Sequence, residues 1–447
     1  MEKMILVPGP QGSRLTLNGE EIWPPTVEEM IFGYNRMDEL LNQDVQVSTI
    51  VDEIEFFRAY KQLQDDLDTI AQQSGETKKR LDFPYDWRKD LLKTADRLAS
   101  VIKDCVDSGS NSITLVCHSG GNLVARALLE GGKYKNESWF GNITKYVGIC
   151  GPHFGVPRIL EYALGLKGSM GISPCDMYKG AKNPDFPSCY QFLPFDGYEV
   201  LWDFQQTPPV AIDFYRQATD PPLCQKNLDA ALALQQTINF TNKPPTVQYN
   251  LMAGSEQLTD ETVNYLGRQS YDPEGDFAGD GMIPIQSSMH TPLPVFVTPG
   301  EHIGIFKSYL FRSKLYEILT DGLLSAALSR ADKTGASLSL NDVVFSPGET
   351  IQLLIIPDLP TDAISDVSLE IARRDDEEPK RFRKIDSRPV VYNGPIIRFI
   401  GAQITAPEKP GAYLITLTGK THSTTPETSA GFVVQKSADL KRSDRLR

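Results

Sequence analysis

A serine stands between an apolar run and a helical pattern in the stretch ITLVCHSGGNLVARALLEGG, residues 113–132. Two positions before and after Ser119 lie Cys117 and Gly121, both small enough to let the backbone turn sharply between a buried strand and a helix. Such a turn presents a hydroxyl at the edge of a sheet, where it can attack a carbonyl carbon. Ser119 is therefore the candidate nucleophile, and the N–H of Gly120 is a candidate donor to the oxyanion.

Two other interpretations of this stretch stay open. The usual motif is G-x-S-x-G, whereas this chain has C-x-S-G-G, so the segment could be a glycine-softened turn without chemistry. Cys117 could also be the nucleophile, although its place at the strand end predicts a side chain packed within the sheet. The strand before the turn and the helix after it favour Ser119.

A serine hydroxyl needs a base, and the chain has five histidines. His118 is adjacent to Ser119 but leaves the turn in another direction, and His422 lies far along the chain in a region of different texture. In proteins with this turn the order is Ser, acid, His, with the His after the last strand. His302, four residues past LPVFVT, is the candidate base. We expect His290 to be a surface or structural residue and His153 to line the substrate pocket.

The acid that orients the base is predicted to be Asp280, which lies between two glycines in DFAGDGMIP. The glycines would let the turn aim the carboxylate toward His302. Asp-Gly is also a common turn dipeptide, and Asp276 and Asp272 are alternative acids.

Short apolar runs and helical patterns alternate over the first 330 residues and must position these side chains. Met4–Val7, SITLVCH, YVGIC, VQYNLMAG and LPVFVT predict buried strands, and apolar residues recur at helical spacing around residues 63–70, 91–102, 121–131 and 303–319. This alternation predicts a parallel sheet covered by helices on both faces.

The alternation lapses over residues 158–243, which are rich in Pro, aromatic and Asp residues. We predict a cap inserted over the edge of the sheet, with Phe192 and Trp202 among the aromatic residues that surround the substrate. After residue 331, alternating strands separated by Pro and Gly turns predict an all-β, immunoglobulin-like sandwich over 331–437, followed by a tail at 438–447.

Composition limits the classes of protein and of partner. With 447 residues, 40% apolar and 23% charged, the chain predicts a globular protein of two domains, 1–330 and 331–437. A formal charge of −13 disfavours nucleic acid as a partner, and neither a transmembrane span nor a signal peptide is expected. These features predict a cytoplasmic protein, compatible with peripheral contact with lipid. No cysteine or histidine spacing predicts a metal site, and no cofactor is expected.

Several motifs occur together in a specific order: LVPGPQGSRL, PYDWR, CHSGG, GPHFGVPRIL, PSCYQFLP, GDGMIPIQS and GEHIGIF. Over residues 4–325 the chain resembles the lecithin:cholesterol acyltransferase-like family of α/β-hydrolases. The resemblance implies an α/β-hydrolase fold with a cap, a triad of Ser119, Asp280 and His302, and an acyl-serine enzyme. Its substrates would be phospholipids or other acyl esters, cleaved by water or by an acceptor alcohol.

The chain departs from this family at Pro10, where the family takes one oxyanion donor from a backbone N–H. Proline has no N–H, so Gln11 would have to supply the second donor from a shifted loop. Loss of one donor can cost about 10²- to 10³-fold in turnover. The alternative function is therefore a weak or inactive hydrolase scaffold that binds a protein partner through its C-terminal sandwich.

Overall fold

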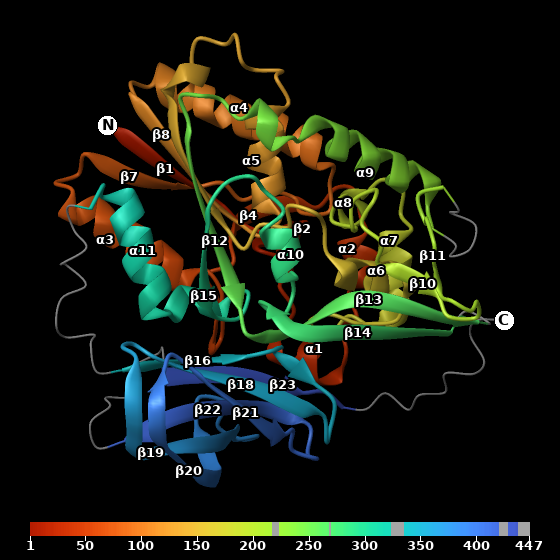
Figure 1. Ribbon diagram of the computed structural model, residues 1–447, viewed down its shortest axis with the longest axis vertical. Helices are drawn as coiled ribbons and strands as arrows, with labels where there is room; N and C mark the ends of the chain where they lie inside the picture. The colour runs from red at the N-terminus through yellow and green to blue at the C-terminus, as the bar shows by residue number, and fades with distance from the viewer. Residues whose placement is uncertain (217–222, 268–269, 323–334, 420–427, 437–447) are drawn as a thin grey trace.

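The computed structural model describes residues 1–216, 223–267, 270–322, 335–419 and 428–436 (Figure 1). Its centre is a six-stranded sheet in which every neighbouring pair is parallel. The strand order is β15 (Val295–Pro299), β12 (Gln248–Ser255), β9 (Ile143–Ile149), β8 (Ser112–His118), β1 (Glu2–Val7) and β7 (Lys78–Asp82). The apolar runs predicted to be buried strands form five of these six, so the predicted parallel sheet is confirmed.

Helices cover both faces of this sheet. Alternate residues of each strand point to opposite faces, so one strand contributes to two separate cores. In β1, Ile5 and Val7 join the core formed with α4 (Leu91–Asp107) and α5 (Gly121–Glu130). Met4 and Leu6 point to the other core, formed with α3 (Lys61–Gln73) and α11 (Tyr309–Leu319). The sheet is thus the middle layer of three.

Short elements surround the start of the chain. A small sheet has the order β3 (Glu20–Trp23), β2 (Ser13–Leu17), β4 (Gln46–Ile50), and a ribbon pairs β5 (Glu53–Ile54) with β6 (Phe57–Arg58). Two short helices, α1 (Val27–Phe32) and α2 (Met37–Leu40), lie between β3 and β4 in the chain. Single turns occur at η1 (Phe140–Asn142), η2 (Phe240–Asn242), α10 (Ile285–Ser288) and η3 (Gly304–Lys307).

The region predicted to be a cap contributes to a separate apolar core and a separate sheet. Its helices are α6 (Pro157–Leu164), α7 (Pro174–Ala181), α8 (Ser188–Gln191) and α9 (Gln225–Thr237). The sheet has the order β11 (Val210–Ala211), β10 (Leu201–Asp203), β13 (Gln257–Gly267), β14 (Ser270–Gly279). The hairpin β13–β14 comes after β12 in the chain, so the cap sheet extends beyond the predicted boundary at residue 243 (Figure 1).

The C-terminal region consists of two sheets around a common apolar core. One has the order β16 (Ala336–Leu340), β18 (Thr350–Pro357), β21 (Ile400–Thr405). The other has the order β17 (Val344–Phe345), β23 (Ser429–Val434), β22 (Gly411–Gly419), β19 (Thr361–Arg374), β20 (Phe382–Ile397). A β-rich region is therefore confirmed here, whereas its immunoglobulin-like topology stays a prediction. Among the described helices, none is long and apolar enough to cross a membrane.

Candidate active site

Ser119 occupies a sharp turn at the carboxyl end of β8. Its φ of 52° lies in the left-handed region, which a residue with a side chain adopts only when its surroundings hold it there. The Ser119 N–H donates to Ile149 O at 2.9 Å, and Asn122 Nδ2 donates to Ser119 O at 2.8 Å. The fixed turn ends β8, and α5 begins two residues later.

The glycine after the turn allows helix α5 to approach β1 closely. A Cβ at Gly121 would lie 2.5 Å from Val7 O and 2.7 Å from Pro8 O, both backbone atoms that cannot move aside easily. The first loop also contacts the serine, since a Cβ at Gly9 would lie 3.1 Å from Ser119 Oγ. The small residues around Ser119 thus bring the loop after β1 against the serine turn.

Asp280 and His302 form a buried hydrogen-bonded pair. His302 Nδ1 lies 2.8 Å from Asp280 Oδ2, and the His302 N–H donates to Asp280 O, also at 2.8 Å. The other carboxylate oxygen of Asp280 accepts the N–H groups of Met282 and Ile283 at 3.0 and 2.7 Å. Gly281, with φ of 88°, makes the turn that folds these N–H groups back onto the carboxylate.

The carboxylates around His302 change its protonation. Burial alone would lower the pKa of the imidazole, but the hydrogen-bonded Asp280 carboxylate and the nearby Glu301 outweigh it and raise the pKa above 6.5. Burial also raises the pKa of Glu301 to about 7, and Glu301 Oε2 accepts the Gly304 N–H at 2.6 Å. The site therefore favours the imidazolium, which a general base must become.

The alternative acids and nucleophile lie in different surroundings. Asp272 and Asp276 are exposed on β14, where Asp276 Oδ1 accepts the Ala278 N–H. Cys117 is fully buried in the core beneath the helices, and burial raises the pKa of its thiol well above its ordinary value. A buried neutral thiol is a poor nucleophile.

The three residues predicted to bind substrate have different surroundings. Phe192 lies against the serine turn, since a Cβ at Gly120 would be 2.4 Å from its Cε1. Trp202 is in strand β10 of the cap sheet. His153 is buried beside Arg126, with Nδ1 3.5 Å from Nη1, and its ring meets that of Phe240 edge-on.

The remaining histidines differ as well. The His290 ring stacks on Phe154 with centroids 3.8 Å apart. His422 lies outside the described residues. His118, which the sequence reasoning set aside, is buried beside His302, with ring centroids 4.6 Å apart. His118 Nδ1 lies 2.7 Å from the hydroxyl oxygen of Tyr60, and no spacing in the sequence predicts this contact.

Three buried side chains in the described part of the chain could offer ligands to a metal ion. The ligand atoms of His118, Cys150 and His302 lie within 4.8 Å of one another. Both ring nitrogens of His118 and Nδ1 of His302 already take part in hydrogen bonds, and the Cys150 thiol contacts the Asp280 carboxylate. A metal ion at this cluster would have to displace these hydrogen bonds.

The parallel sheet, the strained serine turn after β8 and the acid–histidine pair beyond its later strands define an α/β-hydrolase. A family model described as lecithin:cholesterol acyltransferase matches residues 45–290, more than half of the chain. The chain belongs to the lecithin:cholesterol acyltransferase family, as its resemblance to that family predicted.

Solved structures similar to this chain share little of its sequence. One, described as the Tle4–Tli4 complex, is 12% identical with a TM-score of 0.45 and covers 72% of this chain and 99% of that chain. Another, the mature Bacillus licheniformis lipase BlEst2, is 13% identical with a TM-score of 0.33, covering 73% and 89%. The Listeria innocua lin2722 product is 13% identical with a TM-score of 0.31, covering 71% and 94%. No curated protein matches the sequence.

Proposed function

We propose that the protein is a serine hydrolase or acyltransferase of lipid acyl esters, with Ser119 as nucleophile, His302 as base and Asp280 as the group that orients His302. Membership of the lecithin:cholesterol acyltransferase family supports the general activity. The observation that carries the assignment is the 2.8 Å hydrogen bond between His302 Nδ1 and Asp280 Oδ2, at the same edge of the sheet as Ser119.

In this mechanism Ser119 Oγ attacks the ester carbonyl while His302 Nε2 takes its proton. The tetrahedral intermediate expels the alcohol, which receives that proton, and an acyl-serine remains. Water or a second alcohol then attacks the acyl-serine by the same route in reverse. Asp280 stabilises the imidazolium at both stages, consistent with the raised pKa of His302.

The hydrogen bonds of the first loop support Gln11 as the second oxyanion donor. Gly9 N–H donates to Tyr60 Oη at 2.7 Å, and Gly12 N–H donates to Gly9 O at 3.1 Å. Pro10 has no N–H. Within residues 9–12, only the Gln11 N–H has no acceptor among the described residues.

The conformation of this loop is compatible with that role. Gln11 has φ of 63°, and its carbonyl accepts Trp23 Nε1 at 2.8 Å, which fixes the peptide on one side. The Pro10 ring lies against the serine turn, 2.8 Å from where a Gly120 Cβ would be. A shifted donor at Gln11 would compensate for the proline and favours an active enzyme over the alternative of an inactive scaffold.

The test is a set of p-nitrophenyl esters with acyl chains of increasing length, together with phosphatidylcholine vesicles, with and without an acceptor alcohol. Product analysis separates fatty acid from a new ester. Activity lost in Ser119→Ala and retained in Cys117→Ala is the expected result. Activity in Ser119→Ala equal to that of the unchanged protein would contradict the proposal, and no activity in the unchanged, folded protein would favour a scaffold.

A further inference from the structure

A chain of buried hydrogen bonds joins the first loop to the loop that carries His302. The Gly9 N–H donates to Tyr60 Oη at 2.7 Å, Tyr60 Oη lies 2.7 Å from His118 Nδ1, and His118 Nε2 lies 2.9 Å from His302 O. Tyr60 and His118 are almost completely buried. The two loops are far apart in the sequence, and these two side chains span the space between them.

The protons of this chain have one consistent arrangement. The His302 carbonyl can only accept, so His118 Nε2 must carry a proton. Burial, with His302 nearby, lowers the pKa of His118 well below its ordinary value, so its ring is neutral and Nδ1 has a free lone pair. Tyr60 therefore donates its single proton to Nδ1 and accepts the Gly9 N–H. Every bond in the chain has a defined direction.

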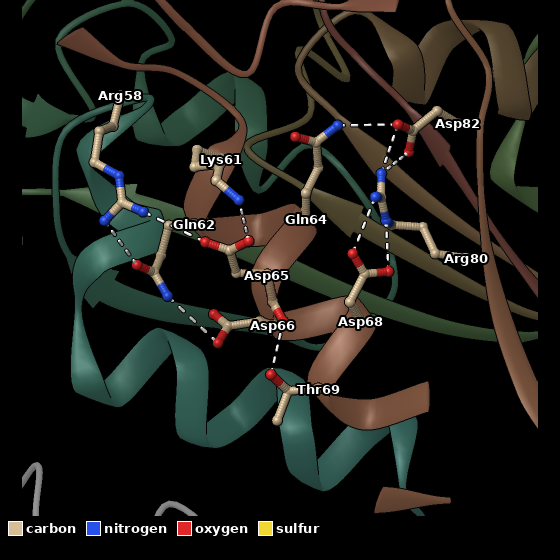
Figure 2. Close-up of polar contacts among 10 residues, drawn as sticks. All are labelled: Arg58, Lys61, Gln62, Gln64, Asp65, Asp66, Asp68, Thr69, Arg80 and Asp82. Carbon is tan, nitrogen blue, oxygen red and sulfur yellow. Dashed lines mark hydrogen bonds and ion pairs between the residues drawn. The ribbon is translucent and has the colours of Figure 1, made fainter. Parts of the chain in front are cut away.

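Tyr60 is held by the helix that follows it. It directly precedes α3, and Figure 2 shows how α3 is fixed: Asp68 binds Arg80 of β7 with Nε–Oδ1 at 2.9 Å, and Gln64 donates to Asp82. On its other side, buried Asp66 pairs with Arg312 of α11, the helix after the His302 loop. The position of the Tyr60 hydroxyl is thus set by the scaffold.

The same bonds fix the backbone of His302 from two directions. Its N–H donates to Asp280 O, and its carbonyl accepts from His118 Nε2. The Phe306 ring packs on both His118 and Tyr60, with centroid distances of 5.0 and 5.8 Å. His118 and Asp280 therefore place the base together, one on each side of its peptide.

We propose that Tyr60 and His118 are positioning residues, which hold the first loop and the His302 loop in fixed positions relative to Ser119. Through Gly9 they set the adjacent Pro10–Gln11 peptide, and through the His302 carbonyl they set the base. This inference rests on the proposed roles of Ser119, His302 and Gln11, and it adds two residues that act on them through backbone atoms of the two loops.

The test compares Tyr60→Phe with Tyr85→Phe in the full chain. Tyr85 is a matched control, because it is also buried but its hydroxyl has no hydrogen-bond partner among the described residues. We expect kcat for p-nitrophenyl butyrate to fall roughly 10- to 100-fold in Tyr60→Phe with little change in KM, since small misplacement of reacting groups is costly. Tyr85→Phe should stay within about twofold of the unchanged protein.

Substitutions of His118 separate the two ends of the chain. A Gln amide can reach where Nε2 lies and keep the bond to His302 O, whereas an Asn amide reaches only the Nδ1 side. His118→Gln should therefore retain more kcat than His118→Asn. The double variant Tyr60→Phe/His118→Asn should lose no more than the worse single variant, because both break one chain.

A readout that does not need activity keeps this inference separate from the proposed function. In protein labelled with ¹⁵N-histidine, the His118 Nδ1 should be unprotonated and Nε2 protonated between pH 6 and 8, in Ser119→Ala as well. If Ser119 proves unreactive but this tautomer is found, the proposed function fails, whereas the hydrogen-bond chain through Tyr60 and His118 is supported. A protonated Nδ1, additive losses in the double variant, or full activity in Tyr60→Phe at a temperature where it is folded would overturn the inference.

Discussion

At the scale of single residues, the site depends on how Asp280 is held. Its two oxygens are used differently: one accepts two backbone N–H groups and the other faces His302 Nδ1. The carboxylate is completely buried, so its charge is not screened by water. In the proposed mechanism, this environment would let Asp280 fix both the tautomer and the orientation of His302.

Asp280→Asn should lower kcat by about 10⁴-fold, because an amide cannot favour the reactive tautomer of His302 as a carboxylate does. Asp276→Asn is the matched control. Asp276 is exposed on strand β14, and its side chain accepts a hydrogen bond from the Ala278 N–H rather than from a histidine. Steady-state hydrolysis of a soluble ester measures both. If Asp276→Asn were the variant that lost activity, the acid would have been misassigned.

The dependence of activity on pH should reflect His302. Because the base must be neutral, kcat/KM should rise with pH through its pKa, and the raised pKa places the midpoint above 6.5. The Glu301 carboxylate contributes to this rise in pKa. Glu301→Gln removes that negative charge, destabilises the imidazolium and should shift the midpoint to lower pH. A midpoint that moved upward or not at all would rule out this electrostatic coupling.

Ser119, Asp280 and His302 could be proposed from the sequence as candidates, because a turn motif and the order of residues along the chain can both be read without the fold. Tyr60 could not, since its hydroxyl reaches His118 only after α3 has packed between β7 and α11. The sequence showed that His118 is adjacent to Ser119, but it could not show which groups its ring contacts. Adjacent side chains on a turn diverge, and only the fold shows what each one meets.

At the scale of elements, the cap brings the aromatic ring of Phe192 to the serine turn. Phe192 follows α8, is buried, and contacts the position of Gly120. Cap strand β10 pairs with β13, whose partner β14 ends one residue before Asp280. The cap sheet therefore leads directly into the loop that carries Asp280.

Phe192→Ala should reduce the preference for octanoyl over acetyl p-nitrophenyl esters by about tenfold, because an apolar wall beside the acyl group is removed. Phe204→Ala is the control, since Phe204 is a cap phenylalanine that is 47% exposed. The ratio of kcat/KM values for the two esters is the measurement. An unchanged ratio in Phe192→Ala would remove this residue from the acyl-binding site.

The hairpin β13–β14 is an element that the sequence did not predict. Its strands contain Asp, Gly and Pro residues that have low strand propensity, and β14 is mostly exposed. The two strands pair with each other along most of their length, and β13 also pairs with β10, about 60 residues earlier. The buried strands of the central sheet were predictable because their apolar runs are continuous, even though their partners also lie far away in the chain.

At the scale of the whole molecule, the C-terminal region contacts the hydrolase through an apolar centre. Val27, Met30 and Ile31 of α1 share a buried cluster with Ala412 and Val433. Ion pairs flank this cluster, where Arg374 meets Glu28 and Glu55. The change in sequence pattern near residue 331 predicts a second domain, but it could not show this buried cluster because the residues of the cluster lie far apart in the chain.

The contact also reaches the loops of the candidate site. A Cβ at Gly304 would lie 2.7 Å from Ser339 Oγ, and one at Gly281 would lie 3.5 Å from Asn341 O. Lys307 Nζ donates to Ser429 O at 3.0 Å. Two independent domains, as the sequence predicts, would let a chain ending near Arg330 hydrolyse small esters within about tenfold of the full rate. With these contacts removed, we expect a larger loss.

A variant of the full chain tests the same interface. Met30→Asp places a charge in the buried cluster and should lower the melting temperature by several degrees, because an unpaired buried charge costs several kcal/mol. Phe32→Asp on the same helix is the control, since Phe32 is 68% exposed. Differential scanning calorimetry compares them. Equal melting temperatures would mean that the two regions do not depend on this contact.

The central claim is that Ser119 forms a covalent acyl-enzyme, and an active-site label tests it most directly. The protein is treated with a fluorophosphonate, and the modified residue is located by intact mass and peptide mapping, with Ser119→Ala and Cys117→Ala in parallel. The mechanism predicts one adduct, on Ser119, that disappears in Ser119→Ala and persists in Cys117→Ala. Absence of an adduct on the folded protein, or an adduct elsewhere that survives Ser119→Ala, would contradict it.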